Sequence, residues 1–268
     1  SLMNGGMTKV YGKINKRVSL IICLIDDFTG NSISDENVRV RISNTSAIKK
    51  RDGHYVFVNL GTGLYNVIIE SRMYLKEVLS VNTEELNLEY PVVYVRLKPG
   101  IMYPIPSQST CIRGTVVQGN KGMDGVVIKA ISESSVRTAK VSEDCAEAGS
   151  KEIKLYMARY TNIEGKEFLV NEDAEEKQEY CKVIEISGDG RYLLQDPLKH
   201  GHGRSVPLVP ITKTYTDTNG NFLIILSSQK KDEITVRLEL QYRESVVHKE
   251  IQVLAGEANN IGKVDIGG

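Results

Sequence analysis

The sequence predicts an all-β protein made of two antiparallel β-sandwiches, the second of them interrupted by a small β module. One observation is a repeated pattern: an Asp-Gly or Asn-Gly turn and then an aromatic residue that opens an apolar run, at residues 52–57 and again at residues 219–224. Another is that short apolar or alternating segments of strand length, separated by turn residues, surround each copy. In the first unit, no segment has the pattern of an amphipathic helix beyond a turn at residues 83–88.

The composition fits an ordinary globular protein and argues against a polyanionic partner. A length of 268 residues with 41% hydrophobic residues is enough for one or two domains with cores of their own. The 34 basic and 34 acidic residues give a formal net charge of zero. We therefore expect no nucleic-acid partner and no membrane insertion, because neither a basic surface nor a long apolar span is present.

The N-terminal segment, residues 1–16, resembles the start of a signal peptide in one respect. Lys13, Lys16 and Arg17 precede the apolar run at residues 18–25. Asp26 and Asp27 follow that run directly, with no small-residue cleavage site, so a buried strand is the expected structure. Localisation stays open between a particle component made in the cytoplasm and the cell surface.

The first sandwich is expected at residues 17–99. Asp52-Gly53 is a strong hairpin signal, and the alternation of apolar and charged residues at 38–42 is typical of a half-buried strand. Short strands with turns between them favour a sandwich. The expected strands are residues 18–25, 38–42, 54–60, 64–69, 74–81 and 92–97.

The second sandwich is expected at residues 110–131 and 214–268, after a connector at residues 100–109. Pro104 and Pro106 should make this connector short and stiff. The expected strands of the second sandwich are residues 111–117, 126–131, 216–226, 234–240, 246–254 and 261–266.

Residues 132–213 separate the second expected strand of this sandwich from the third. A structureless loop of that length is improbable inside a compact domain. The segment also contains strand-like pieces, at residues 153–160, 167–170, 180–187 and 192–194, and an acidic loop at residues 171–179. We therefore expect a small β module threaded into the second sandwich.

The motifs of both units resemble a known family. In the first unit they are Asp27-Phe28-Thr29-Gly30, Asp52-Gly53-x-Tyr55-x-Phe57 and Gly63-x-Tyr65-x-Val67, and in the second Thr216-Asp217-x-x-Gly220-x-Phe222. This pattern is similar to the carboxypeptidase regulatory-like, or transthyretin-like, β-sandwich, although Lys231-Asp232-Glu233 stands where the second unit should have Gly-x-Tyr. The resemblance implies Ig-like sandwiches that act as non-catalytic spacers, stalks or adhesion units, and it does not identify a ligand.

The inserted segment has a weaker likeness of its own. Residues 183–188, Tyr192-Leu193-Leu194, Pro197-Leu198 and His202 are similar to a strand–turn–strand pattern of small β-barrels in phage tail-like particles. This likeness implies a role in a protein assembly.

Two segments offer candidate metal ligands. His200-Gly201-His202 with Asp196 nearby could bind a transition metal, because two His separated by one residue can face the same side of a strand. A flexible Gly-rich loop with exposed imidazoles is the favoured interpretation. Residues 217–221 resemble the start of a calcium loop but lack the later Glu, so a β-turn is favoured there.

The remaining acidic and sulfur-containing residues also have alternatives. Asp26, Asp27, Asp35 and Glu36 form an acidic cluster, which we interpret as solvated turn carboxylates rather than a cation site. The four cysteines could form two disulfides, but no Cys-x-x-Cys is present and Cys23 lies in an apolar run. Free thiols are therefore favoured for Cys23, Cys111, Cys145 and Cys181.

No sequence motif of a catalytic nucleophile or of a phosphate-binding loop is present, so we expect no enzyme activity and no cofactor. The favoured function is a non-catalytic structural or interaction protein with protein partners in a larger assembly, either phage-tail-like or at a surface. The alternative is a carbohydrate-binding or adhesion module of a secreted bacterial protein. Since the chain has no Trp, the aromatic surface for a glycan or another partner would come from Tyr156, Tyr160, Tyr180 and Tyr192. Partner identity and oligomeric state are left open.

Overall fold

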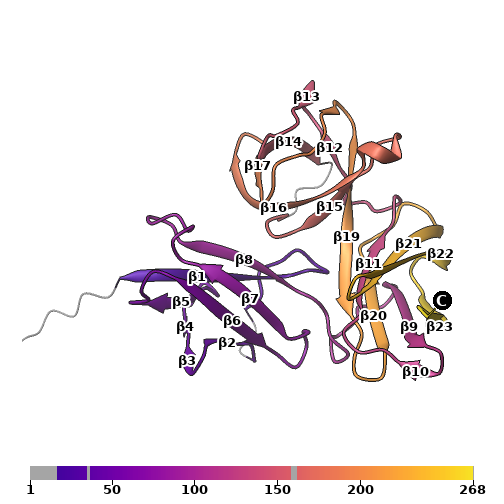
Figure 1. Ribbon diagram of the computed structural model, residues 1–268, viewed down its shortest axis with the longest axis horizontal. Helices are drawn as coiled ribbons and strands as arrows, with labels where there is room; N and C mark the ends of the chain where they lie inside the picture. Colours follow the sequence, from indigo (N-terminus) through magenta and orange to yellow (C-terminus); the bar gives the residue numbers. More distant parts are fainter. Residues whose placement is uncertain (1–16, 35–36, 158–161, 268) are drawn as a thin grey trace, which may run out of the picture.

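The computed structural model describes residues 17–34, 37–157 and 162–267. In these ranges the regular elements are β-strands, apart from the 3-10 helix η1 (Glu175–Lys177), and the predicted all-β fold class is confirmed. Figure 1 shows two sandwiches side by side and a β-barrel that projects from the second one. The described part of the chain contains no helix that is long and apolar enough to span a membrane.

The first sandwich consists of two four-stranded sheets. Its long central strand is β1, whose apolar run is buried, and β8 pairs with β1 in parallel while the other pairs are antiparallel. One sheet has the order β4 (Ile48–Lys49), β5 (Tyr55–Val58), β1 (Val18–Asp26), β8 (Val92–Leu97). The other has the order β3 (Thr45–Ser46), β2 (Arg39–Ile42), β6 (Leu64–Glu70), β7 (Glu77–Asn82).

The second sandwich repeats this strand order. Its strands are β9 (Thr110–Gln118), β10 (Lys121–Gly122), β11 (Val127–Ile131), β19 (Pro207–Tyr215), β20 (Asn221–Leu226), β21 (Glu233–Tyr242), β22 (Ser245–Leu254) and β23 (Ala258–Asp265). The order β20-β9-β23, with β23 parallel to β9, corresponds to β5-β1-β8. The order β19-β11-β21-β22 corresponds to β3-β2-β6-β7. The two units therefore share a topology as well as a sequence pattern.

The inserted segment forms a closed barrel. Its strands follow the order β12 (Ala139–Val141), β14 (Glu152–Met157), β17 (Arg191–Leu194), β16 (Glu179–Gly188), β15 (Glu167–Val170) and β19, and β12 pairs back onto β19. A two-stranded sheet of β13 (Cys145–Ala146) and β18 (His202–Gly203) lies beside it. Closure removes the open edges that a small sheet of this kind would otherwise expose.

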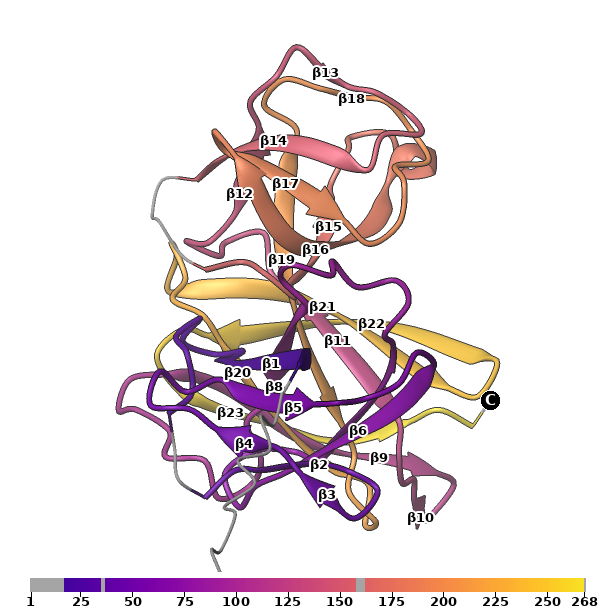
Figure 2. The same cartoon turned by 90° about the vertical axis from the view of Figure 1, so that its left-hand side faces the viewer.

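Strand β19 belongs to the barrel and to the second sandwich at once. Residues 208–210 pair with β15 of the barrel, whereas residues 211–215 pair with β11 of the sandwich. Figure 2 shows β19 descending from the barrel into the sandwich. The sequence pattern predicts residues 207–213 as part of the inserted module and gives no strand there, and this prediction is wrong. The reason is that Pro207 and Pro210 interrupt the pattern of a strand, although both lie within β19 here.

The insertion replaces a tight connection. In the first sandwich only Ser43 and Asn44 separate β2 from β3. The corresponding strands of the second sandwich, β11 and β19, start their pairing at Ile131 and Ile211 with the whole barrel between them. The chain thus leaves the sandwich and returns to it in register.

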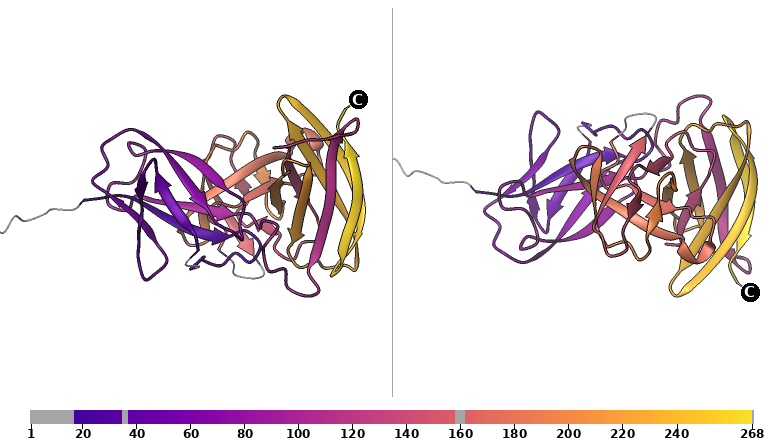
Figure 3. Two further views of the ribbon diagram at one scale, coloured as in Figure 1. Left: turned by 90° about the horizontal axis from the view of Figure 1, so that it is seen from below. Right: turned by 90° about the horizontal axis from the view of Figure 1, so that it is seen from above.

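The connector between the sandwiches is packed rather than merely stiff. Tyr103 is buried in the core of the first sandwich, and Ile105 packs against the same cluster. Cys111 and Ile225 of the second sandwich also belong to this cluster. The hydrophobic core therefore continues from one sandwich to the other. Figure 3 shows the molecule from below and from above, with the two sandwiches one after the other along its long axis.

Because β19 is shared, the barrel and the second sandwich should unfold together. Phe168 is 1% exposed in the barrel core. We expect Phe168→Ala to lower the free energy of unfolding by about 3–5 kcal/mol in urea denaturation, and to lower the protection of amides in β11 and β21 as well as in the barrel. Leu64→Ala, at an exposed position of β6, is the control and should change stability little. Loss of protection confined to the barrel would contradict the coupling.

Candidate functional site at the junction of the three bodies

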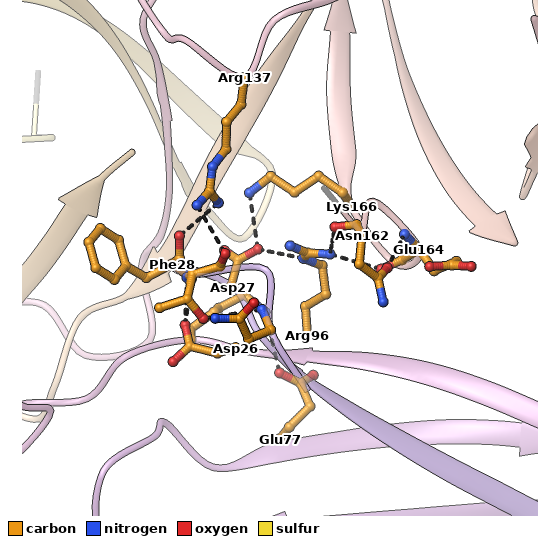
Figure 4. Close-up of polar contacts among 12 residues, drawn as sticks. Asp26, Asp27, Phe28, Glu77, Arg96, Arg137, Asn162, Glu164 and Lys166 are labelled. Atoms are coloured by element: carbon orange, nitrogen blue, oxygen red, sulfur yellow. Dashed lines mark hydrogen bonds and ion pairs between the residues drawn. The ribbon is translucent and has the colours of Figure 1, made fainter. Parts of the chain in front are cut away.

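The turn after β1, residues 26–30, is where the first sandwich meets the barrel (Figure 4). Asp26, 6% exposed, organises the turn from within the first sandwich. Its Oδ1 accepts hydrogen bonds from the backbone N–H groups of Phe28 (2.8 Å) and Thr29 (2.9 Å). Its Oδ2 accepts from the hydroxyls of Tyr74 (2.8 Å) and Tyr103 (2.7 Å). Asp26 therefore fixes the turn to the connector that leads into the second sandwich.

Asp27 links the first sandwich to the barrel through a buried ion network. Its Oδ1 accepts from Nε of Arg96 on β8 (2.9 Å) and from Nζ of Lys166, next to β15 (3.0 Å). The side chains of Asp27, Arg96 and Lys166 are only 8%, 6% and 10% exposed. Charges buried to this extent are tolerated only when they are paired, so the network holds the two bodies together.

Two arginines extend the junction by binding backbone carbonyls of the opposite body. Arg137, on the segment from β11 to the barrel, donates to the carbonyls of Phe28 (2.8 Å) and Thr29 (3.0 Å). Arg96 donates in the other direction, to the carbonyls of Asn162 (3.2 Å) and Glu164 (3.0 Å). Figure 4 shows these side chains converging on the turn. The contacts are reciprocal, since each body supplies both a cation and acceptors.

The charges at the junction shift each other's protonation equilibria. Burial raises the pKa of Asp27, but the positive charges of Lys166 and Arg96 outweigh it, and the net pKa lies well below the usual value. Burial lowers the pKa of Lys166, and the attraction of Asp27 opposes this only in part. Asp27 is therefore held as a carboxylate at any ordinary pH.

Two glycines allow the backbones to approach at the junction. Gly165 has φ +73°, and a Cβ there would lie 3.1 Å from Cγ of Arg96. Gly30 has φ +76°, and a Cβ there would lie 3.6 Å from the carbonyl oxygen of Asn162. Any side chain at either position would strain the backbone, and at Gly165 it would also displace the arginine that pairs with Asp27.

These observations correct one interpretation of the sequence. Asp26 and Asp27 are not solvated turn carboxylates, because both are buried and bonded. Asp35 and Glu36 lie outside the described residues. The sequence signal for this junction was a pair of adjacent aspartates at the end of an apolar strand, but their partners are up to 139 residues away in sequence.

Of the candidate metal ligands, Asp196 is exposed, His200 is half-buried and His202 is buried. His202 is fully buried, and its Nδ1 and Nε2 each lie 2.8 Å from a carboxylate oxygen, of Glu172 and Glu179 respectively. The exposed-imidazole interpretation is therefore wrong for His202. Among the residues that the structure describes, no group of three or more His, Cys, Asp or Glu side chains is arranged to hold a metal ion.

Glu179 receives further hydrogen bonds from the backbone N–H groups of Lys199 and His200. Burial raises the pKa of Glu179, but these donors and His202 outweigh it, so the net pKa is lowered. Glu179, at the end of the acidic loop at residues 171–179, therefore stabilises the barrel from within.

The segment that resembles the start of a calcium loop, residues 217–221, forms a turn. The carboxylate of Asp217 accepts hydrogen bonds from the backbone N–H groups of Asn219 and Asn221, as expected for a β-turn.

Of the four tyrosines expected to form an interaction surface, the three that the structure describes have different environments. Tyr192 is buried in the barrel core. Tyr180 donates to Oε2 of Glu239 (2.6 Å), and its ring lies 4.2 Å from Nζ of Lys129, so it packs the barrel against the second sandwich. Tyr156 is 63% exposed on β14. Tyr160 lies outside the described residues.

All four cysteines are free thiols in the structure, and Cys23, Cys111 and Cys181 are buried. Burial raises the pKa of Cys23 to about 11 and that of Cys181 to about 12, so both are unreactive at neutral pH. Cys145 is exposed on β13.

No protein-family model matches the chain, and no curated protein is similar to it in sequence. The D295N mutant of shaft pilin SpaA from Lactobacillus rhamnosus GG matches 95% of this chain and 99% of its own, at 8% identity and a TM-score of 0.25. GBS52, the minor pilin of Streptococcus agalactiae, matches 92% of this chain and 95% of its own, at 11% identity and a TM-score of 0.22. At such scores the description of the fold rests on the strand pairing itself.

The buried network predicts a specific sensitivity at Asp27. We expect Asp27→Asn to lower the free energy of unfolding by about 3–5 kcal/mol, because it leaves Arg96 and Lys166 buried without a counter-charge. Urea denaturation measures this loss. Asp144→Asn is the matched control, since Asp144 pairs with Arg204 at 2.9 Å but is 95% exposed, and it should change stability little. Equal effects of the two variants would contradict the assignment.

The same network predicts a pH dependence. Because the pKa of Asp27 is lower in the folded than in the unfolded chain, its contribution is complete above the unfolded pKa of about 4 and is lost as the pH falls through the folded value. The stability difference between the wild type and Asp27→Asn should therefore be largest at neutral pH and shrink progressively below about pH 4. Denaturation curves of both proteins across pH measure it; a difference that grows on acidification would have the wrong sign.

Proposed function

We propose that this protein is a non-catalytic structural component of a larger protein assembly, in which two sandwiches and a barrel act as one rigid unit. The observation that carries the proposal is the buried network of Asp27, Arg96 and Lys166 between the first sandwich and the barrel. These charges stay buried and paired only while the first sandwich and the barrel keep one relative arrangement. A subunit of a larger assembly needs such a fixed shape.

Two further features support rigidity. Strand β19 runs unbroken from the barrel into the second sandwich. The hydrophobic core of the first sandwich continues through Tyr103 and Ile105 into the second. At the junction, the charged side chains are bonded to one another or to backbone carbonyls, as in a structural network rather than a site open to a substrate.

The inserted barrel is the best candidate for the partner-binding element. It projects away from the line of the two sandwiches (Figure 1) and carries exposed apolar side chains on its strands, Tyr156 at 63% and Ile186 at 43%. The first sandwich lacks such an insertion, since two residues suffice between β2 and β3. Recognition by an element presented on a rigid scaffold is a common arrangement in binding proteins.

Excision of the barrel tests this function. Because Ile131 and Ile211 are register partners, residues 132–210 can be replaced by Asn-Gly to restore the tight β2–β3 type of connection. We expect the shortened chain to unfold cooperatively but to lose the partner that the intact chain retains in affinity capture, with bound partner reduced at least about tenfold. Tyr156→Ala with Ile186→Ala in the full chain should weaken capture without lowering stability. Unchanged capture by the excised chain would refute the role of the barrel.

A further inference from the structure

The outermost strand of the second sandwich has an uncovered edge. The nine-stranded sheet that includes the barrel is closed at one end by the β12–β19 pairing, and its other end is β22. All ten residues of β22 pair with β21 without a bulge. Figure 1 shows β22 on the side of the second sandwich that faces away from the first. Bare edges of this length attract further strands unless they are blocked.

The hairpin geometry shows which backbone groups of β22 face outward. Tyr242 and Ser245 are register partners across a two-residue loop, and the residues that close such a loop hydrogen-bond each other. Antiparallel pairing alternates from there, so the odd-numbered residues of β22 bond to β21 and the even-numbered ones point to the open edge. The side chain of Asn259 confirms this parity, because it accepts from the N–H of Leu254 (2.9 Å) and donates to its carbonyl (2.9 Å).

Asn259 therefore ends the open edge at Leu254, and the hairpin loop ends it at Ser245. Between these limits, four residues present a backbone N–H and a C=O to the outside: Val246, His248, Glu250 and Gln252. Within the described chain, no hydrogen bond to these backbone groups is found. The set is symmetric about Lys249, since 246 and 252, and likewise 248 and 250, are equally far from it.

We propose that β22 pairs with β22 of a second copy of this chain, antiparallel, with a two-fold axis at Lys249. In this register Val246 stands opposite Gln252 of the second copy, and His248 stands opposite Glu250 of the second copy. The two-fold axis repeats each of these pairs on the other side of Lys249. Every outward N–H and C=O of the four residues then finds a partner, because antiparallel hydrogen-bonded pairs exchange both bonds. On the other face Val247 stands opposite Ile251, and these two partly buried side chains extend the core.

The side-chain charges fit the same register. Within one copy, Glu250 is the register partner of Arg237, and His248 is that of Glu239. Across the axis, Glu250 meets His248 of the second copy. On the face of the joined sheet that carries the barrel, one row therefore reads Arg237 and Glu250 of one copy, then His248 and Glu239 of the second copy, with acidic and basic groups alternating. Glu239 at the end of this row is only 12% exposed and also pairs with Lys129 at 3.3 Å. Opposite charges on facing strands stabilise a sheet. The cost is that the two Lys249 side chains meet at the axis, which limits the strength of the pair.

The dimer goes beyond the proposed function and involves a different surface. The Asn-Gly excision of the barrel leaves β22 intact, so self-association and partner capture can succeed or fail separately. Isologous pairing of one edge is also self-limiting, because it consumes the edge of both copies and yields a closed dimer rather than a fibre.

Sedimentation velocity of the full chain from about 10 µM to about 1 mM tests the association, and hydrogen exchange at the two extremes tests its site. We expect a monomer–dimer equilibrium. Exchange of the amides of Val246, His248, Glu250 and Gln252 should slow on dimerisation, while those of Val247, Lys249 and Ile251, already bonded to β21, should not change. A monomer throughout the range, or a dimer in which the four amides exchange as in the monomer, would overturn the proposal.

Charge exchange provides a test of register that does not depend on folding defects. His248→Glu places a second carboxylate opposite Glu250 of the other copy, on both sides of the axis, and should raise the dissociation constant of the dimer at least about tenfold. Adding Glu250→Lys to this variant should restore the dimer. His54→Glu, on the first sandwich, makes the same charge change away from β22 and should leave association unchanged. Melting temperatures of all variants report whether the fold is kept. Failure of the double exchange to restore a dimer that the single change weakens would refute this register.

Discussion

The Asp27 carboxylate, held between Arg96 and Lys166, is the interaction on which the arrangement of the protein depends. Removing these charges from water is costly, and their mutual attraction compensates only while all three stay in contact. The network therefore makes separation of the first sandwich from the barrel unfavourable. Because the barrel is continuous with the second sandwich through β19, fixing the barrel against the first sandwich fixes all three bodies.

The insertion is compatible with this rigidity because of where the chain leaves the sandwich. A hairpin connection is the position at which extra residues least disturb a sheet, since the flanking strands keep their register. Ile131 and Ile211 do so across the barrel. The returning strand serves both bodies, so the barrel is an extension of the second sandwich rather than a domain on a flexible tether. Arg137, on the outgoing segment, then binds the turn of the first sandwich.

The repeated turn motifs and the apolar run of β1 were enough to predict the all-β class, because burial and alternation are local properties of the sequence. The junction was not predictable in the same way. Asp27 and Lys166 are separated by 139 residues, and Asp27 has the same sequence neighbours whether it is solvated or buried. His202 illustrates the same limit: a Gly-His-Gly segment indicates a loop, whereas in the structure the imidazole is buried and pairs with two glutamates that are distant in sequence. Strand β19 was missed because its prolines obscure a pairing that only the tertiary structure makes evident.

We propose that the buried ion network, together with strand β19, holds the three bodies as a single rigid unit. Double electron–electron resonance tests it most directly, with spin labels at Leu64 on the first sandwich and Tyr156 on the barrel, both exposed, in a chain where exposed Cys145 is replaced by Ser. We expect one narrow distance distribution for the otherwise unchanged chain and a clearly broader one for Asp27→Asn. A broad distribution in the parent, or an equally narrow one in the variant, would contradict it.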